Sequence, residues 1–415
     1  MTKSTLLHTL ALKAMKLAPP PPPYFYPSQK ANHPAREDSR PLKRANLTSH
    51  ALAAHTAHSL STNAALDSTP SSSTLPKAPP SQSTTPPTPS ESTPFFSLLI
   101  PVYNTESYIA RCLESCINQS FKDIEILVID DCGQDNAIEI AKDYATKDPR
   151  IQILHNPRNL GLFHTRDVGI KQAHGKYILH VDSDDFIAPE TCQRLHERIT
   201  QDYASSGVYS DICCFGMHYY PATIKRAKPL QLTRTLHDEA ILRAIYIAPA
   251  SPPWHIWGKV FLRSTCLEVE SFISTHLSEL SPIVMGEDVL RLLIAARFSH
   301  KLIALEDCLY YYCDSTSSIC RQSDPATIAK RKNDLHYLIT TLASLKTKPL
   351  ITPTTLRAIT RAQNILHATI ILESRHAPRA FAYPIACLKS LKLHQKWQTY
   401  VRIALYFISF GRLKL

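Results

Sequence analysis

Short apolar stretches alternate with longer amphipathic ones from about residue 95 onward. Apolar runs of strand length occur at 97–104, 125–131, 151–156 and 176–181. Segments with the 3.6-residue spacing of a buried helix face lie between them, at 106–119, 135–146 and 162–174. Strands that alternate with helices in this way are typical of βαβ crossovers. We therefore predict an α/β fold with a mostly parallel, Rossmann-like sheet flanked by helices.

Local signals help to set the ends of these elements. Thr105 stands where the first helix begins and is expected to be its N-cap. Gly175 follows the third helix and is expected to stop it. A further helix at 189–202 and a strand at 211–220 continue the pattern, after which its regularity weakens.

The first 94 residues have a different composition. A polyproline run is followed by a long stretch that consists mostly of Ser, Thr, Pro and Ala. Such a composition buries too little apolar surface to offset the entropy of the chain. We predict a disordered extension over 1–94, a folded domain over 95–325 and a separate C-terminal region over 326–415.

The C-terminal region is predicted to be helical and basic. It contains 15 Lys or Arg and only 2 Asp or Glu. Residues 95–325, in contrast, contain 22 Lys or Arg and 29 Asp or Glu. Near its end, apolar residues follow helical spacing along one face: Trp397, Tyr400, Val401, Ala404, Leu405 and Ile408. Such a helix suits an anionic membrane surface. Packing against the protein's own domain is the alternative, and no nucleic-acid-binding motif accompanies the charge.

Composition also bears on where the protein is found. No run of about 18 uncharged apolar residues occurs, so we expect no transmembrane helix. The first 17 residues are a weak amphipathic start rather than a secretory signal. Eleven scattered Cys favour reduced thiols. We expect a cytoplasmic protein that contacts the inner face of the cytoplasmic membrane peripherally.

The most informative local feature is the acidic end of the fourth strand. Asp182, Asp184 and Asp185 directly follow an apolar run. Crowded carboxylates at the end of a buried strand repel one another unless a cation is present. Mg²⁺ or Mn²⁺ bridging to a diphosphate would explain the group, although acids also occur at ordinary exits from strands.

Polar residues follow two other predicted strands as well. Tyr103 and Asn104 come after the first strand, and Asp130 and Asp131 end the second. Since the carboxyl ends of parallel strands share one edge of the sheet, these residues should meet the acidic group there. An aromatic ring, acids and a cation suit a nucleotide sugar. The glycine-rich phosphate loops of other nucleotide-binding proteins are missing, which leaves Arg166 as the candidate for binding phosphate.

The order and spacing of these residues resemble family 2 glycosyltransferases. The resemblance covers roughly residues 95–320. Its motifs are Pro101-Val-Tyr-Asn104, Ile129-Asp-Asp131, Asn159-Leu-Gly161, Arg166-Asp-Val-Gly169, Asp182-Ser-Asp-Asp185, Trp257-Gly-Lys259, Gly286-Glu-Asp288 and Tyr310-Tyr-Tyr312. Two positions depart from the usual pattern: Cys132 precedes Gly133 where a small polar pair such as Gly-Ser is usual, and Asp167 stands where Asn is common.

The resemblance implies a GT-A fold and an enzyme that transfers a sugar from a nucleoside diphosphate with inversion. It implies that Asp288 is the general base with Glu287 beside it, and that Asp184 binds Mg²⁺ or Mn²⁺. It places Trp257 and Lys259 on the acceptor side. The residues implied in binding the nucleotide sugar are Pro101, Tyr103, Asn104, Asp130, Asp131, Arg166, Asp182 and Ser183.

The implied donor is UDP-linked, and the implied acceptor is a hydroxyl of a surface glycan such as lipopolysaccharide or capsule. Independently of the resemblance, a sugar hydroxyl is a poor nucleophile that needs a nearby carboxylate. The alternative from another class is a noncatalytic sugar-nucleotide-binding or scaffold protein of the same fold. A nucleotidyltransferase is disfavoured because its phosphate loop is missing, and Asp288 could also simply favour the start of a helix.

Overall fold

The computed structural model describes residues 93–222, 230–249, 251–277, 282–315, 324–349 and 351–372, together with the single residues 280, 322, 388, 400, 401, 403, 404 and 407. The chain divides into two units, Met1–Thr85 and Pro86–Leu415. The first unit, and with it nearly all of the predicted disordered extension over 1–94, lies outside the described residues.

The predicted alternation of strands and helices is confirmed from residue 96 to residue 220. In chain order the elements are β1 (Phe96–Val102), α2 (Glu106–Ile117), β2 (Ile124–Asp130), α3 (Ala137–Ala145), β3 (Ile151–His155), α4 (Gly161–Gln172), β4 (Tyr177–His180), β5 (Phe186–Ile187), α5 (Thr191–Ser206) and β6 (Ile212–Tyr220). They continue with β7 (Leu236–His237), α6 (Glu239–Leu242), the π-helix η1 (Arg243–Ile247), β8 (Lys259–Leu262), α7 (Arg263–His276), α8 (Glu287–Phe298), β9 (Lys301–Cys313), α9 (Pro325–Leu345) and α10 (Pro353–Leu372).

These strands form one sheet in the order β3-β2-β1-β4-β8-β6-β9-β5, with β7 paired to β9. The four strands from β3 to β4 are parallel, as predicted. Beyond β4 the sheet is mixed, because β8 runs antiparallel to both β4 and β6. The expected α/β fold is therefore confirmed, and the expected parallel arrangement holds for the first half of the sheet.

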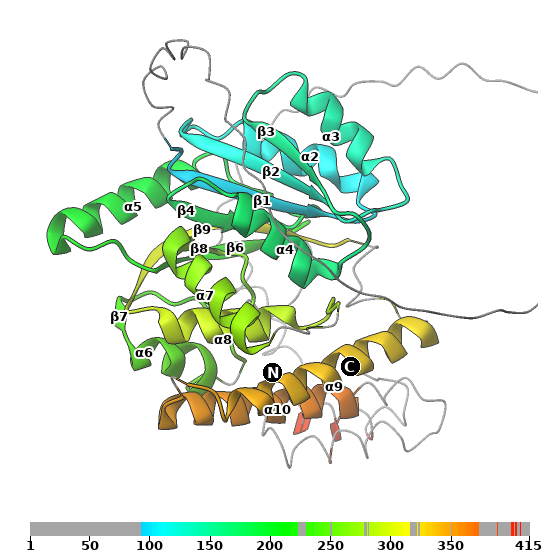
Figure 1. Cartoon of the computed structure of the whole chain (residues 1–415), viewed down its shortest axis with the longest axis vertical. Coiled ribbons are helices and arrows are strands. Elements are labelled where there is room, and N and C mark those ends of the chain that lie inside the picture. Colours follow the sequence, from blue (N-terminus) through cyan, green and yellow to red (C-terminus); the bar gives the residue numbers. More distant parts are fainter. Residues whose placement is uncertain are drawn as a thin grey trace, which may run out of the picture. The chain divides into compact units, whose positions relative to one another are not determined.

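Helices cover both faces of the sheet (Figure 1). Along β1, successive side chains point to opposite faces. Leu98 and Ile100 pack with apolar residues of α2, α3 and α5, whereas Leu99 packs with those of α4, α7 and α8. Each side chain of this kind contributes about 1.5–3 kcal/mol to the stability of the fold when it is fully buried. The two cores therefore hold the sheet in place below the edge that carries the acids.

Two predicted helix boundaries have a different physical basis from the one expected. Thr105 is the N-cap residue of α2, but its hydroxyl makes no capping hydrogen bond. Asp135 acts instead, because its Oδ2 accepts from the backbone N–H of Glu106 (2.7 Å). The helix α4 ends at Gln172, before Gly175. Gly175 is required for a close approach, since a Cβ there would lie 2.5 Å from the backbone nitrogen of Ser97.

The helices α9 and α10 pack against the same core as α8. Leu338 on α9 and Ile359 on α10 are fully buried in it. Of the predicted amphipathic face further along the chain, the structure describes only Tyr400, Val401 and Ala404, and all three are exposed. Trp397, Leu405 and Ile408 lie outside the described residues.

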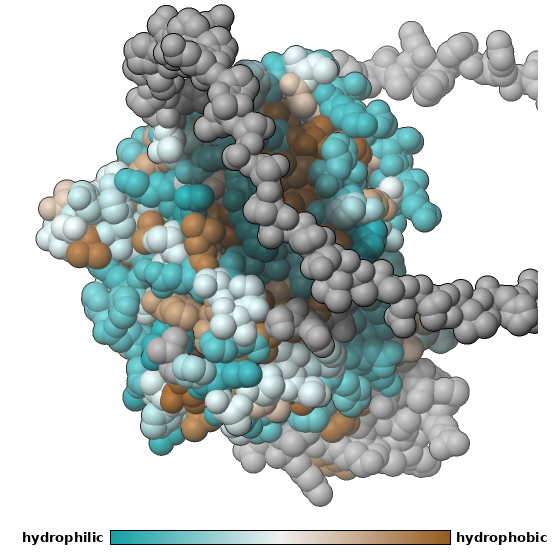
Figure 2. Space-filling model, viewed as in Figure 1, coloured by the Kyte–Doolittle hydropathy of each residue, from teal (hydrophilic) through white to brown (hydrophobic). Residues whose placement is uncertain are grey.

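The described helices include none with the length and hydrophobicity needed to cross a membrane. On the face shown in Figure 2, hydrophilic residues predominate. Apolar residues there form small separate areas, apart from a recessed one in the upper half of the view.

Candidate functional site

The sheet topology brings the predicted site residues to one edge of the sheet, formed by the carboxyl ends of the parallel strands and called the rim below. Val102, Asp130 and His155 are register partners across β1, β2 and β3. The parallel strand β4 ends nearby, and the acidic segment follows it. The carboxyl ends of β1, β2 and β4, three of the four parallel strands, therefore carry the candidate residues, as the alternation of strands and helices predicted.

The acidic segment is a tight turn. The carbonyl of Asp182 accepts from the backbone N–H of Asp185 (2.9 Å), so Ser183 and Asp184 occupy the two corner positions. Ser183 is buried and Asp184 is half-buried. The predicted metal ligand thus lies at the corner of a turn that hydrogen bonds hold at both ends.

Asp185 anchors this turn to β9. Its Oδ2 accepts from the hydroxyl of Tyr310 (2.8 Å), and its Oδ1 accepts from the backbone N–H of Cys313 (2.7 Å). The Tyr310 hydroxyl in turn accepts from the backbone N–H of Asp182 (3.1 Å). Burial, together with the charges of Asp184 and Asp182, raises the pKa of Asp185 well above its ordinary value. Asp185 therefore stabilises the turn and is not available to a ligand.

Arg166 on α4 joins the acidic turn to the start of α8. Only 1% of its surface is exposed. Its Nη2 donates to Asp182 Oδ1 (2.6 Å) and its Nη1 to Asp288 Oδ1 (2.9 Å), and Nη1 also contacts Glu287 Oε1. Burial raises the pKa of Asp182 to about 6; the Arg166 charge opposes this rise, and the charges of Asp184 and Asp288 add to it. One buried guanidinium therefore gathers three predicted site acids.

The two acids at the start of α8 differ in accessibility. Gly286 precedes them with φ +79°, a conformation that favours glycine. Glu287 is 1% exposed and lies between Arg166 and Arg291. The side chain of Asp288 keeps 24% of its surface exposed. Of the two, Asp288 alone can reach a substrate without a rearrangement.

Arg291 forms a second group of buried ions behind the first. Its guanidinium contacts Asp167 and Glu270 and donates to the carbonyl of Phe163 (3.1 Å). Burial favours the neutral form of Asp167, but the Arg291 charge and hydrogen bonds lower its pKa to about 2. For Glu270 burial dominates and raises the pKa to about 6. The unusual Asp at 167 is thus explained by its ion pair with Arg291.

The sequence analysis identified neither Arg291 nor Glu270. The only local signal for Arg291 was its position four residues after Glu287, a spacing that allows ion pairs if the segment is helical.

The part of the rim formed by the loops after β1 and β2 is more open. The side chain of Tyr103 is 49% exposed, whereas Pro101 lies buried within β1. Asn104 has φ +53°, and its Oδ1 accepts from the backbone N–H of Gln134 (2.7 Å). A Cβ at Gly133 would lie 2.9 Å from the backbone nitrogen of Asn104. This close packing fixes the loops that follow β1 and β2 against each other and leaves the Tyr103 ring accessible.

Asp130 and Asp131 have different environments. Asp131 is 4% exposed, and its carboxylate accepts from the backbone N–H groups of Leu160 (2.7 Å) and Gly161 (3.0 Å) at the start of α4. Asp130 accepts from the backbone N–H of Cys132 (2.9 Å), and its Oδ2 lies 2.9 Å from His155 Nδ1. Asp131 therefore caps a helix, which leaves Asp130 as the better placed acid for a nucleotide.

The two predicted acceptor-side residues lie around the start of β8. The Trp257 ring stacks on His255 (centroids 3.7 Å apart) and on Tyr310 (5.2 Å). Lys259 is 2% exposed, and its Nζ donates to the carbonyl of His255 (2.5 Å). Burial lowers the pKa of Lys259 to about 8, against the opposing charges of Cys214 and Asp288. Trp257 thus links this segment, through Tyr310, to the acidic turn.

The chemistry of the site fits a divalent cation held jointly by protein and ligand. Within the described ranges, no group of three or more His, Cys, Asp or Glu side chains is arranged to hold a metal ion. Mg²⁺, however, is usually bound by one or two carboxylates together with substrate phosphates. Two buried arginines, Arg166 and Arg291, are surrounded by five acids, so the net charge of this part of the site is negative and favours a further cation. The acids are Asp167, Asp182, Glu270, Glu287 and Asp288.

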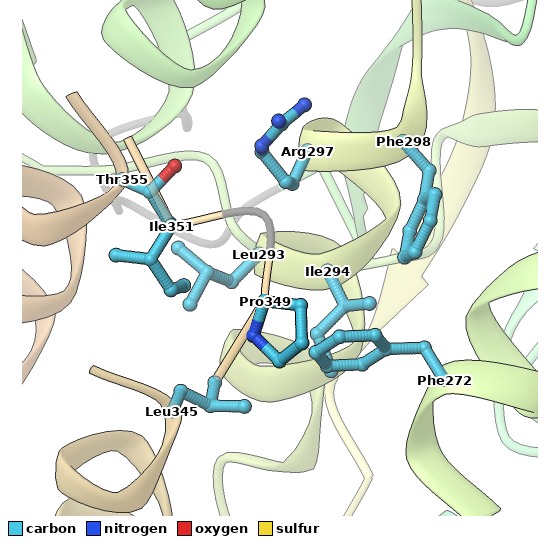
Figure 3. Close-up of a pocket in the computed structure, with 9 residues that line it drawn as sticks. All are labelled: Phe272, Leu293, Ile294, Arg297, Phe298, Leu345, Pro349, Ile351 and Thr355. Atoms are coloured by element: carbon cyan, nitrogen blue, oxygen red, sulfur yellow. The ribbon is translucent and has the colours of Figure 1, made fainter. Parts of the chain in front are cut away.

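An apolar pocket elsewhere in the protein is separate from these acids. It lies between α7, the C-terminal half of α8 and the connection from α9 to α10, and apolar side chains face into it (Figure 3). Its lining residues are Phe272, Leu293, Ile294, Arg297, Phe298, Leu345, Pro349, Ile351 and Thr355. Because Asp288 lies at the other end of α8, this pocket is not part of the rim.

Comparisons with known proteins agree with the resemblance of the sequence motifs. Residues 97–242 match the family model described as glycosyl transferase family 2. An uncharacterized glycosyltransferase, EpsJ of Bacillus subtilis (strain 168), is 32% identical over 232 residues, which are 54% of this chain and 63% of that protein.

A chondroitin synthase of Escherichia coli is 31% identical over 117 residues, or 28% of this chain and 17% of that protein. This chain therefore spans less than two thirds of the length of these curated relatives. Among solved structures, the crystal structure of S. aureus TarS 1-349 is similar with a TM-score of 0.49 and 19% identity, over 76% of this chain and 91% of that one.

Proposed function

This chain belongs to glycosyl transferase family 2 through its residues 97–242, and on that premise we propose that it is an inverting, metal-dependent glycosyltransferase. Its α/β architecture agrees with the GT-A fold expected for the family. The observation that carries the proposal is the position of Arg166, which joins Asp182 of the acidic turn to Asp288 of α8. Two acidic motifs far apart in the sequence thereby form one site.

The proposed reaction uses Asp288 as the general base. Its partly exposed carboxylate takes the proton of an acceptor hydroxyl, whose oxygen then forms a bond to the anomeric carbon of the donor sugar. The bond from that carbon to the diphosphate oxygen breaks on the opposite side, so the configuration inverts. Glu287 is buried between two arginines and holds Arg166 and α8 in place.

On the donor side, Tyr103 stacks on the base, and Asp130 accepts from the base or the ribose. Pro101, Asn104, Asp131 and Ser183 shape the loops around them. Asp182 faces the ribose, and Asp184 binds Mg²⁺ or Mn²⁺. When bound, this cation neutralises the negative charge that develops on the leaving diphosphate. Arg166 acts through Asp182 and Asp288, since its guanidinium is already surrounded by carboxylates.

We propose a UDP-linked donor and a surface-glycan acceptor such as lipopolysaccharide or capsule, with Trp257 and Lys259 on the acceptor side. A relative named as a chondroitin synthase supports a glycan acceptor. Further parts of the proposal are a catalytic domain over 95–325, an extension over 1–94 that is either a tether or dispensable, and a basic helical region over 326–415. The exposed Tyr400 and Val401 and the basic charge of that region support a cytoplasmic enzyme that contacts an anionic membrane peripherally.

The test is hydrolysis and transfer with a panel of UDP- and GDP-linked sugars in the presence of Mn²⁺. We expect turnover of at least one donor, its loss when EDTA removes the cation, and its recovery when Mn²⁺ or Mg²⁺ is restored. The alternative, a noncatalytic sugar-nucleotide-binding or scaffold protein, predicts nucleotide binding without turnover of any donor.

A further inference from the structure

Each acid of the turn after β4 has its own anchor. The carboxylate of Asp182 is bound by Arg166, and that of Asp185 by Tyr310 and by the backbone of Cys313. For Asp184, the proposed metal ligand, an anchor of the main chain is observed. Arg111 Nη2 donates to the carbonyl oxygen of Asp184 (2.9 Å).

Arg111 is held in place by aromatic side chains around its guanidinium. It lies on α2, which belongs to a different core of the sheet from the α4 helix of Arg166, and its guanidinium lies over aromatic rings. The distances from its Cζ to the ring centroids are 5.1 Å for Phe186, 5.3 Å for Tyr220 and 6.0 Å for Tyr108. Rings from α2, β5 and β6 thus fix a planar cation in a single orientation, so little freedom is lost when it forms its hydrogen bond.

The hydrogen bond to the carbonyl restrains the peptide that joins Asp184 to Asp185. Asp184 occupies a corner of a tight turn, where a change of the backbone dihedrals would redirect its side chain. Groups that hydrogen-bond to a metal ligand and fix its orientation affect metal affinity strongly, although they do not contact the metal themselves. Arg111 also brings a positive charge to a segment that contains three acids.

We propose that Arg111 is a positioning residue that holds Asp184 in the orientation required to bind the divalent cation of the donor complex. The inference rests on the proposed function, because it assumes that Asp184 binds a cation together with a nucleoside diphosphate. Nothing in the sequence motifs assigns a role to Arg111.

The experiment measures Mn²⁺ binding to the full chain in the presence of UDP, and separately of GDP, from the electron paramagnetic resonance signal of free Mn²⁺. Arg111→Ala should raise the dissociation constant of Mn²⁺ by about tenfold or more. Arg111→Lys keeps the charge but loses the planar group, so it should recover only part of the affinity. Thermal unfolding of each variant is followed in parallel.

Arg198→Ala is the matched control. Arg198 also donates to a backbone carbonyl, that of Ala304 (3.0 Å), from a partly buried position at a different part of the sheet. This variant should bind Mn²⁺ within about twofold of the unmodified protein, as expected for a site remote from the metal. The proposal is overturned if both Arg111 variants bind Mn²⁺ as tightly as Arg198→Ala does. Should Arg111→Ala not fold, Arg111→Lys decides by the same comparison.

The failure of the proposed function gives a different result. If the unmodified protein binds no Mn²⁺ with either nucleotide, the metal-dependent function is wrong and the role of Arg111 falls with it. If the unmodified protein binds Mn²⁺ and the Arg111 variants bind it equally well, the function stands and only the inference about Arg111 is lost.

Discussion

Arg166 Nη1 donates to Asp288 Oδ1 at 2.9 Å, from a side chain with 1% of its surface exposed. The same guanidinium binds Asp182 at the end of β4, so the proposed base and the proposed donor site share one cation. Removal of one partner of a buried ion pair costs far more than removal of an exposed one, because the remaining charges stay buried without compensation. The distance between the two halves of the site therefore depends on Arg166.

Arg166→Met should destabilise the protein and reduce turnover together. It leaves Asp182, Glu287 and Asp288 without their common cation, so we expect the free energy of unfolding to fall by about 3–5 kcal/mol in urea titrations. Arg194→Met, which breaks an exposed pair with Glu197, is the control and should change little. Equal stabilities of the two variants would show that the carboxylates around Arg166 do not need it.

Substitution of the two acids of α8 should separate chemistry from stability. Asp288→Asn should lower kcat by about 10²–10⁴-fold and leave the nucleotide dissociation constant nearly unchanged, because the amide oxygen can still accept from Arg166 but the side chain cannot take up a proton. Glu287→Gln leaves Arg166 and Arg291 with less negative charge, so its main effect should be on the temperature of unfolding. Normal turnover of Asp288→Asn would disprove its role as the base.

Substitution of Asp130 and of Asp131, the two acids at the end of β2, should also have different effects on UDP binding and on stability. Asp131→Ala deprives α4 of its N-terminal acceptor and should destabilise the protein by about 1–3 kcal/mol. Asp130→Ala should weaken UDP binding by roughly tenfold or more with a smaller effect on stability, because a charge-assisted hydrogen bond to the ligand is lost. Isothermal titration calorimetry and urea unfolding measure the two quantities, and a reversed pattern would assign the nucleotide to Asp131.

The contribution of Lys259 to the stability of the protein should rise in the alkaline range. Burial lowers the pKa of Lys259 to about 8 in the folded protein, below its ordinary value of 10.5. Between these two values the unfolded chain holds the proton more tightly, so the contribution of Lys259 to the free energy of unfolding increases with pH, by on the order of 3 kcal/mol across the interval.

Lys259→Met has no such amine and is the reference for this effect. The difference in unfolding free energy between the unmodified protein and Lys259→Met should move in favour of the unmodified protein from about pH 8 to about pH 10. A difference that stays constant over this range would mean that Lys259 titrates alike in the two states.

Membrane contact is predicted to require the exposed residues Tyr400 and Val401. The double variant Tyr400→Ser, Val401→Ser of the full chain should float with anionic phosphatidylglycerol vesicles at least severalfold less than the unmodified protein. The matched control is Tyr203→Ser, Val208→Ser, which removes exposed residues of the same types from another part of the protein. Equal flotation of all three proteins would exclude this face as the membrane contact.

Periodicity predicted the first half of the fold well, because β1 to β4 are buried strands that alternate with amphipathic helices. It also predicted that Tyr103, Asp130 and Asp182 follow strands that end at one edge, which needs only the rule that crossover strands are parallel. The direction of β8 between β4 and β6 could not be predicted, since an apolar run has no preference for either direction.

The partners of the buried charged residues also could not be predicted from the sequence. Asp131 looked like a ligand-binding acid, but its carboxylate caps a helix that begins 30 residues later. Arg111 looked like an ordinary helix residue, and only the folded chain places it on the carbonyl of Asp184. Such contacts depend on side chains that meet across the sheet, which spacing along the chain does not encode.

The ion pair between Asp167 and Arg291 has a consequence for the evolution of this group of proteins. An Asn at 167 would leave the Arg291 guanidinium with Glu270 and Glu287, whereas loss of Arg291 would leave Asp167 and Glu270 buried without their shared cation. The second change is the costlier one, because it leaves buried carboxylates without compensation. Homologues that lack an arginine at 291 should therefore have uncharged residues at 167 and 270.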